Sequence, residues 1–289
     1  MISIDANAKI NLTLDILGKR NDGYHEVAMV MQEVSLHDTL YMEQISSGIE
    51  LEIAGSDLPA DESNLCYRAA SLVKDECGIE SGVRIKLEKN IPVAAGLAGG
   101  STDAAAVLKG MNELFSINMP EDRLCSLGAR LGSDIPFCIM GGTMLATGRG
   151  EILKPLPDFA DVDIVLAKPQ VGVSTAWAYK TFDAGYTGAH PDNDAMIKAI
   201  EFGDVSGVSK LLCNVLESVT INECAIIDTY KQTMIKAGAL CSMMSGSGPT
   251  VFGIAPDEAT AEVMAAAIKN IDSGAAVFTA KTVGRNRGL

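Results

Sequence analysis

Basic residues are scarce in this chain of 289 residues, which carries 23 Lys and Arg against 37 Asp and Glu. The formal net charge is −14 and the isoelectric point is near 4.6. Proteins that bind nucleic acids or anionic membranes usually present a basic surface, so this charge argues against both classes. If the substrate is a phosphate ester, its attraction must come from local backbone amides, a few cations and a metal ion.

Paired cysteines, long apolar runs and targeting signals are also lacking. The seven cysteines show no C-x-x-C spacing and their number is odd, which predicts free, buried thiols in a reducing cytoplasm and argues against a zinc site. No apolar run approaches the roughly 20 residues that a membrane helix needs. The N-terminus, interrupted by Asp5 and Lys9, does not resemble a signal peptide. We therefore expect a cytoplasmic protein that acts away from membranes, and the sequence leaves monomer or homodimer open.

The chain is long enough for two modest domains, and 47% hydrophobic residues suffice for a sizeable core. Two prolines in three residues, Pro155-Leu-Pro157, mark the best boundary, because a new strand pattern follows them. We expect one domain over residues 1–157 and a second over 158–289. Helical patterns alternate with strand patterns, and the strands are expected at 2–17, 27–36, 40–53, 83–88, 143–147, 162–167, 239–244, 250–254 and 275–283.

The most informative stretch is a glycine loop at residues 92–103, Pro-Val-Ala-Ala-Gly-Leu-Ala-Gly-Gly-Ser-Thr-Asp. It joins a strand pattern to a helix pattern, so its backbone N–H groups would gather at a helix N-terminus, where phosphate binds well. Ser101 or Thr102 is a plausible cap for that helix. The loop has neither the Gly-Lys-Ser/Thr of a P-loop nor the Gly-x-Gly-x-x-Gly dinucleotide fingerprint. From the loop alone, phosphate binding and a flexible packing turn are about equally good interpretations.

Two polar features lie near the N-terminus. Alternation along the first strand pattern places Lys9 and Asn11 on one face, which would ordinarily be a solvated face. The turn signal Asn21-Asp-Gly23 then sets Tyr24 beside His25. By itself this is a surface turn, but it pairs an aromatic ring with an imidazole.

Two further features lie later in the chain. Asp134, within Gly132-Ser-Asp-Ile-Pro136, precedes a short apolar run, so its simplest role is a helix cap. A second glycine loop, Ser245-Gly-Ser-Gly-Pro249, joins two strand patterns and by itself is a tight hairpin turn. Neither signal alone specifies a chemistry.

Taken in order, these blocks resemble the GHMP small-molecule kinases. The blocks shared with the superfamily are Ala8-Lys-Ile-Asn-Leu12, the glycine loop and the second glycine loop. Markers of a branch whose substrate carries a diphosphocytidyl group are Asp22-Gly-Tyr-His-Glu26, Asp61-Glu-Ser-Asn-Leu65 and Leu131-Gly-Ser-Asp-Ile-Pro-Phe137. The resemblance covers nearly the whole chain, and the order of the blocks makes it specific.

The resemblance implies an α+β fold of two domains with the active site between them. The N-terminal domain would be a ribosomal-protein-S5-like ATP-binding domain, and the C-terminal domain a ferredoxin-like α/β domain. The implied reaction uses ATP and Mg²⁺ to phosphorylate the 2-hydroxyl of 4-diphosphocytidyl-2-C-methyl-D-erythritol, in the non-mevalonate route to isopentenyl diphosphate. Phosphoryl transfer of this kind depends mostly on positioning and on charge neutralisation.

The resemblance also assigns roles to residues. Asp134 would be the general base for the substrate hydroxyl, and Lys9 the cation that the missing P-loop lysine would otherwise supply. The implied substrate-binding residues are Asn11, Tyr24, His25 and Tyr179. The tyrosine rings would stack on cytosine, and the imidazole would hydrogen-bond the base edge.

ATP would be held mainly by the glycine loop. The implied ATP-binding residues are Asn64, Pro92, Val93, Ala94, Ala95, Gly96, Leu97, Ala98, Gly99, Gly100, Ser101 and Thr102. Many GHMP kinases have a serine pair where this chain has Gly99-Gly100, so the hydroxyl that meets Mg²⁺ is left open between Ser101 and Thr102.

The sequence disfavours three other functions. A GHMP kinase of mevalonate or homoserine is disfavoured by the pair Tyr24-His25, because those substrates carry no base to stack. A nucleotide-binding homologue without turnover is disfavoured because both Lys9 and Asp134 are present. Nucleic-acid binding is disfavoured by the charge.

Overall fold

The structure is a computed structural model, and it describes residues 1–182, 186 and 188–285. The chain forms two compact units, each assembled from separate stretches. The first unit consists of Met1–Ala8, Leu36–Ile91 and Ala98–Met140, and the second of Lys9–Ser35, Pro92–Leu97 and Gly141–Leu289. The long strands β1 (Ile2–Lys19) and β2 (His25–Ile45) contribute residues to both units. The boundary at residue 157 stays a prediction.

The first unit combines four strand segments, which are the start of β1, the end of β2, β3 and β4, with four helices. β3 (Ile49–Ala54) runs parallel to β4 (Gly82–Glu88), and the end of β2 pairs antiparallel with β4. Because parallel neighbours need a crossover connection, the chain between β3 and β4 carries α1 (Leu65–Cys77). The other helices are α2 (Gly99–Leu114), α3 (Glu121–Leu131) and α4 (Ile135–Met140).

Alternation along β4 decides which of its faces enters the core. Val83, Ile85 and Leu87 are buried in one hydrophobic cluster with residues of α1 and α2. Arg84 and Lys86 point the other way and form salt bridges at the surface. Burying each aliphatic side chain stabilises the fold by about 1.5–3 kcal/mol, so this period-two pattern fixes the register of β4.

The second unit contains two groups of strands. In one group, β5 (Thr143–Gly148) pairs antiparallel with β2 and with β6 (Ile152–Pro155), and β8 (Cys213–Asn214) pairs parallel with β1. The other group is an antiparallel sheet with the order β11-β7-β10-β9. Its strands are β7 (Asp163–Lys168), β9 (Cys241–Met244), β10 (Val251–Ile254) and β11 (Ala276–Lys281).

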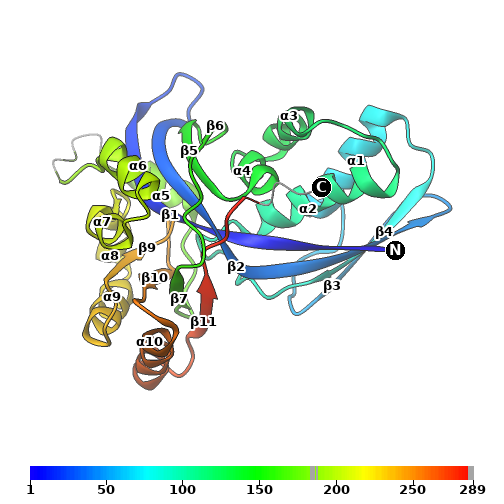
Figure 1. Ribbon diagram of the computed structural model, residues 1–289. Helices are drawn as coiled ribbons and strands as arrows, with labels where there is room; N and C mark the ends of the chain where they lie inside the picture. The colour runs from blue at the N-terminus through cyan, green and yellow to red at the C-terminus, as the bar shows by residue number, and fades with distance from the viewer. Residues whose placement is uncertain (183–185, 187, 286–289) are drawn as a thin grey trace. The chain divides into compact units, whose positions relative to one another are not determined.

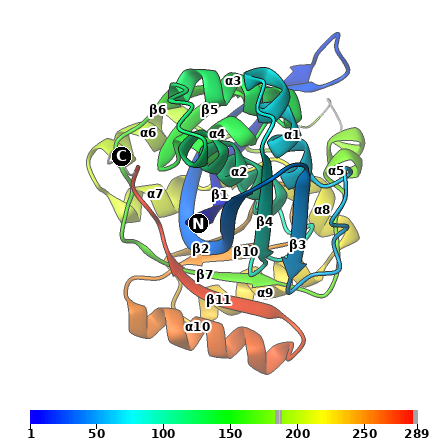
Figure 2. The same cartoon turned by 90° about the vertical axis from the view of Figure 1, so that its right-hand side faces the viewer.

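Two helices cover the antiparallel sheet. α9 (Ile226–Lys236) packs on β9 and β10, and α10 (Glu258–Ile271) packs on β7 and β11 (Figures 1 and 2). Asp257 caps α10 by accepting from Thr260 N over 2.8 Å. The four strands of this sheet and the two helices that cover it follow the order β7-α9-β9-β10-α10-β11, which is the ferredoxin-like arrangement that the family resemblance implied. Further helices of the unit are α5 (Thr175–Thr181), α6 (Asn193–Glu201), α7 (Val205–Leu211) and α8 (Glu217–Glu223). The α+β class is confirmed.

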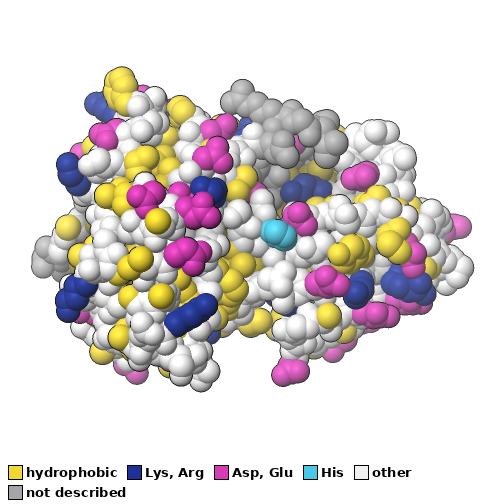
Figure 3. All heavy atoms as spheres, turned by 60° about the horizontal axis from the view of Figure 1, so that its bottom comes forward, with side chains coloured by type: hydrophobic (Ala, Val, Ile, Leu, Met, Phe, Trp, Pro, Cys, Tyr) yellow, Lys and Arg dark blue, Asp and Glu magenta, His cyan; other side chains and the backbone are white. Residues whose placement is uncertain are grey.

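The surface carries charges of both signs, and the cysteines form no disulfides. On the face drawn in Figure 3, acidic and basic side chains are interspersed, so the excess negative charge there is spread out. All seven cysteines are free, as predicted, but the prediction that they are buried holds only for Cys66 and Cys241 and is wrong for the other five, which are partly exposed. In the described part of the chain, no helix has the length and apolar character needed to cross a membrane.

Candidate active site

One face of β1 carries four polar side chains in alternation, and all four are buried: Lys9, Asn11, Thr13 and Asp15. The ordinary interpretation of this pattern, a solvated strand face, is therefore wrong. Buried polar groups are costly unless they are hydrogen-bonded. Accordingly, Lys9 Nζ donates to Asn11 Oδ1 over 2.6 Å, and Thr13 Oγ1 donates to Asn193 Oδ1 over 2.6 Å.

Segments far apart in the sequence meet beside Lys9 in the second unit. Lys9 N donates to the carbonyl oxygen of Leu97, in the glycine loop, over 3.2 Å. Ser245 Oγ, in the second glycine loop, donates to the carbonyl oxygen of Gly96 over 3.0 Å. The glycine loop is thus hydrogen-bonded both to β1, at Lys9, and to the second glycine loop, at Ser245.

The two loops approach so closely that glycine is required at the contact. Gly96 has a φ of +74°, and a Cβ there would lie 2.2 Å from the carbonyl oxygen of Ser245. Gly246 has a φ of +58°, and a Cβ there would lie 3.0 Å from the carbonyl oxygen of Gly96 and 3.5 Å from Asn11 Oδ1. The glycines therefore bring backbone, rather than side chains, next to Asn11.

The glycine loop enters α2 earlier than the sequence predicted. Helix α2 begins at Gly99, and its N-cap is Ala98, which has left-handed backbone angles and makes no side-chain cap bond. The N–H groups of Ser101 and Thr102 both donate to the carbonyl oxygen of Ala98. The expectation that Ser101 or Thr102 caps this helix is wrong, because the turn at Ala98 starts the helix before them.

The structure distinguishes the two hydroxyls that the sequence left open. Thr102 is buried, and its Oγ1 donates to the carbonyl oxygen of Asn7 over 2.7 Å. This bond anchors the first turn of α2 to β1 within the first unit. Ser101 is half-buried in the same turn. The Thr102 hydroxyl therefore already serves a structural contact.

Tyr24 and His25 lie at the end of a turn that is held by side-chain bonds of Asp22 and Arg20. Asp22 Oδ1 accepts from Tyr24 N over 3.1 Å, and Arg20 pairs with Asp22 and with Glu26. Tyr24 remains 54% exposed, so its ring is available for stacking. The turn thus presents an aromatic surface without burying it.

Two residues from later in the chain lie against this turn in the second unit. The ring centroids of His25 and Tyr179, on α5, are 5.5 Å apart. The guanidinium of Arg149 lies 4.9 Å from the centroid of the Tyr24 ring, a cation–π contact. Burial, together with the charge of Lys19, lowers the pKa of His25, which favours the neutral imidazole. Sequence reasoning missed Arg149, because Gly148-Arg-Gly150 reads only as a turn between strands.

The remaining predicted site residues belong to the first unit. Asp134 is half-buried and immediately precedes α4, near the start of a helix as predicted. Asn64 is the N-cap of α1, where its Oδ1 accepts from Cys66 N over 2.9 Å and its Nδ2 donates to the carbonyl oxygen of Pro59 over 2.8 Å. The amide of Asn64 thus has a structural role that the sequence did not reveal.

No group of three or more His, Cys, Asp and Glu that could hold a metal ion occurs among the residues that the structure describes.

The second glycine loop is held by a buried side chain that the sequence did not identify. The buried Asn214 donates through Nδ2 to the carbonyl oxygens of Met244 and Gly246, over 2.9 and 2.8 Å. No short motif marks such a residue, because its partners lie about 30 residues away in the chain.

Comparison with known proteins gives the chain its family. Models of the GHMP kinases N terminal domain and the GHMP kinases C terminal domain match residues 64–142 and 196–272. A 4-diphosphocytidyl-2-C-methyl-D-erythritol kinase from Acetivibrio thermocellus is 50% identical over 269 residues, which are 93% of this chain and 95% of that protein. A crystal structure of 4-(cytidine 5'-diphospho)-2C-methyl-D-erythritol kinase is 34% identical, covers 98% of this chain and 100% of its own, and superposes with a TM-score of 0.84. A homoserine kinase from Cytophaga hutchinsonii shares the fold with a TM-score of 0.79 at 20% identity, over 99% of this chain and 96% of its own. The chain therefore belongs to the GHMP kinase family.

Proposed function

We propose that this protein transfers the γ-phosphoryl group of ATP to the 2-hydroxyl of 4-diphosphocytidyl-2-C-methyl-D-erythritol. The observation that carries the proposal is the hydrogen-bonded convergence of Lys9, the glycine loop and the second glycine loop. Kinase relatives named for this substrate are about half identical to the chain over most of its length. A place in the non-mevalonate route to isopentenyl diphosphate follows from the substrate.

ATP phosphates would be held by backbone rather than by a lysine of the loop itself. The N–H groups of Gly99 and Gly100 precede the first hydrogen bonds of α2, which Ser101 N and Thr102 N make to the carbonyl oxygen of Ala98, and the helix dipole favours an anion there. Lys9 would neutralise charge that develops during transfer. These groups act by position and charge, which is what phosphoryl transfer requires.

Mg²⁺ would arrive with the nucleotide. It prefers oxygen ligands and usually keeps several waters, so a phosphate-bound ion needs few ligands from the protein. We propose Ser101 as the hydroxyl nearest the metal, because the Thr102 hydroxyl is buried and donates to Asn7. The metal would neutralise phosphate charge when bound.

The acceptor would be recognised at the turn around Tyr24. The exposed Tyr24 ring and the Tyr179 ring are proposed to stack on cytosine, with a neutral His25 hydrogen-bonding the base edge. Asn11 would contact the substrate beside Lys9. Asp134 would accept the proton of the 2-hydroxyl as it attacks.

The test is ADP release by purified protein with ATP, Mg²⁺ and the cytidyl substrate, run beside mevalonate and homoserine. We expect turnover only with the cytidyl substrate. Turnover only with mevalonate or homoserine would show that the acceptor is misassigned. Nucleotide binding without turnover of any acceptor would favour a sensor. A cytoplasmic location, and monomer or homodimer as the oligomeric state, stay predictions.

A further inference from the structure

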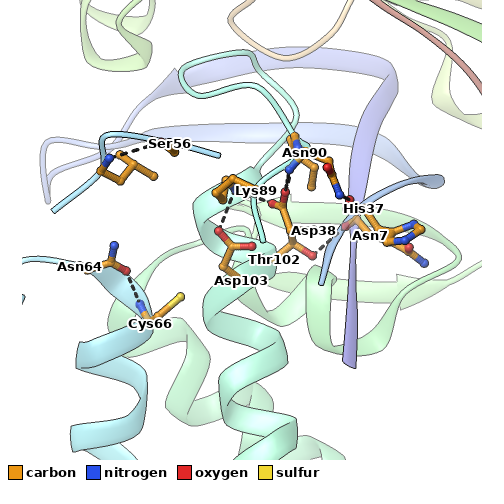
Figure 4. Close-up of polar contacts among 12 residues, drawn as sticks. Asn7, His37, Asp38, Ser56, Asn64, Cys66, Lys89, Asn90, Thr102 and Asp103 are labelled. Atoms are coloured by element: carbon orange, nitrogen blue, oxygen red, sulfur yellow. Dashed lines mark hydrogen bonds and ion pairs between the residues drawn. The ribbon is translucent and has the colours of Figure 1, made fainter. Parts of the chain in front are cut away.

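A buried ion cluster lies at the base of the glycine loop, within the first unit. The ammonium of Lys89 lies between the carboxylates of Asp38 and Asp103 (Figure 4). Lys89 Nζ donates to Asp103 Oδ2 over 2.9 Å and also to Asp38 Oδ2. The side chains of Lys89 and Asp103 are 3% exposed and that of Asp38 is 0% exposed, so water screens none of these charges effectively.

Asp38 fixes the chain as it leaves β4 for the loop. Its Oδ1 accepts from Asn90 N over 2.5 Å and from Ile91 N over 2.8 Å. These bonds to backbone N–H groups set the direction of the two residues directly before Pro92. Hydrogen bonds to a carboxylate are among the stronger ones in proteins, so they fix the backbone direction where the chain leaves β4.

The bond between Lys89 and Asp103 joins the two sides of the loop. Lys89 lies just before the glycine loop, and Asp103 is the last residue of the loop, in the first turns of α2, which begins at Gly99. A Cβ at Gly99 would lie 3.1 Å from Ile91 Cγ2 and 3.2 Å from Lys89 Nζ. A side chain at this position would crowd the ammonium and Ile91, which gives a physical reason for glycine at position 99.

A contribution to the free energy of folding does not explain the cluster well. Removing an ammonium and two carboxyl groups from water is costly, and apolar replacements of buried ion pairs are often neutral or stabilising. Asp103 Oδ1 is buried and has no hydrogen-bond partner in the described structure, which adds to the cost. What the cluster does supply is a fixed geometry between the end of β4 and the start of α2.

We propose that Asp38, Lys89 and Asp103 form a clasp that holds the glycine loop in the shape that binds ATP phosphates. They are positioning residues that act through the loop backbone and do not touch the nucleotide. This inference rests on the proposed function of the loop as the ATP site. If the clasp acts in this way, the affinity for ATP depends on Asp38, Lys89 and Asp103, and the affinity for the acceptor does not.

The test compares variants of Asp103 in the full-length protein. Asp103→Ala opens the clasp, and we expect the KM for ATP to rise roughly tenfold, the loss of one charge-assisted hydrogen bond. The KM for the cytidyl substrate should stay within about twofold, because its proposed contacts are elsewhere. Asp103→Asn keeps a carbonyl oxygen for Lys89 and should restore most of the affinity for ATP. An unchanged KM for ATP in a folded Asp103→Ala protein would overturn the proposal.

A matched control separates positioning from general loss of stability. Val107→Ala removes buried apolar atoms one turn further along α2, and Val107 has no polar side-chain group that could bond to the clasp. It should lower the melting temperature without raising the KM for ATP. If Val107→Ala raises that KM as much as Asp103→Ala does, the effect is general and the clasp is wrong.

A second variant tests the clasp if Asp103→Ala does not fold, and a binding measurement tests it if the proposed reaction is absent. If Asp103→Ala does not fold, Asp38→Asn keeps an acceptor for the N–H groups of Asn90 and Ile91 and weakens the hold on Lys89, so it should also lower ATP affinity. Calorimetric binding of adenylyl imidodiphosphate with Mg²⁺ needs no acceptor substrate. It therefore tests the clasp even if the proposed reaction is absent, and unchanged affinity in folded Asp38→Asn would contradict the clasp.

Discussion

Ser245 donates its hydroxyl hydrogen to the carbonyl oxygen of Gly96 over 3.0 Å, although the two residues are 149 positions apart in the chain. Ser245 is fully buried, so the bond is shielded from water. It joins the two glycine loops within the second unit. The geometry of the proposed phosphate site therefore depends on a contact that neither loop could make alone.

Gly96→Ala should abolish most activity, because the new methyl group would overlap the carbonyl oxygen of Ser245 and force an unfavourable φ. A displacement of about 1 Å at a reacting group can cost roughly 100-fold in rate, and we expect a loss of at least this size in kcat/KM for ATP. Strain of this kind should also destabilise the fold by about 1–3 kcal/mol. Steady-state kinetics and thermal unfolding measure the two effects.

The control for this substitution is Gly78→Ala. Gly78 also has a positive φ, of +64°, but nothing lies within 4 Å of a Cβ there. It should lose a similar amount of backbone stability and keep its activity. Equal activity losses in the two variants would mean that strain alone, and not the contact between the loops, explains the result.

Asp134→Asn should lower kcat by about 10²–10⁴-fold while nucleotide binding persists, because the change removes the proposed base and leaves the glycine loop intact. Binding of a nucleotide analogue by calorimetry, beside ADP release, separates the two properties. Asp122→Asn, an exposed change on α3, is the charge-matched control and should keep full activity. Full activity in Asp134→Asn would place the base elsewhere.

The sequence predicted helices and strands well where the hydrophobic residues follow a single periodicity. β4 and α10 follow the alternation and the capping signal that mark them. The strands predicted at 27–36 and 40–53 are instead one strand, His25–Ile45, followed by β3. The polar residues His37-Asp38 look like a break, but Asp38 is buried there because Lys89, far along the chain, provides its partner.

The same reason limits the prediction of the site. Motif order identifies Lys9 and Tyr24 as candidates, because those residue types carry the chemistry. It does not show that Thr102 bonds to Asn7 or that the guanidinium of Arg149 lies over one face of the Tyr24 ring. Such roles are created by contacts between distant segments, and no local pattern encodes them.

Tyr24→Ala should raise the KM for the cytidyl substrate roughly 10- to 100-fold, since stacking on one base contributes about 1–3 kcal/mol. The KM for ATP should not change. Tyr24→Phe keeps the ring and the contact surface for Arg149, so it should stay near the wild-type value. An unchanged KM for the cytidyl substrate in Tyr24→Ala would remove the stacking role.

The stability of the protein should depend on pH through Asp103. Burial raises the pKa of Asp103 to about 8, with Asp38 adding to the shift and Lys89 opposing it. In the unfolded chain the pKa of an aspartate is about 3.9. The folded state therefore binds a proton more tightly, so this contribution to stability is fully present below about pH 4 and is lost as the pH rises towards 8.

The measurement is the difference in unfolding free energy between wild type and Asp103→Asn from pH 5 to 8.5. Taking the difference cancels the shared titrating groups that lie away from Asp38 and Lys89, the two groups that interact with Asp103. The wild type should lose stability relative to the variant as the pH rises. A difference that is constant across this range would show that Asp103 stays ionised in the folded protein.

Asn214→Asp tests the support of the second glycine loop. The carboxylate keeps an acceptor for Leu216 N but loses both donors to the carbonyl oxygens of Met244 and Gly246. Because the site is buried, we expect a loss of about 1–3 kcal/mol in the free energy of unfolding, and a lower kcat/KM for ATP because Gly246 lies against Gly96. Asn222→Asp, at an exposed amide on α8, is the matched control and should change neither quantity. If Asn214→Asp loses stability but keeps wild-type kinetics, the second glycine loop does not shape the phosphate site, and its role is confined to the fold.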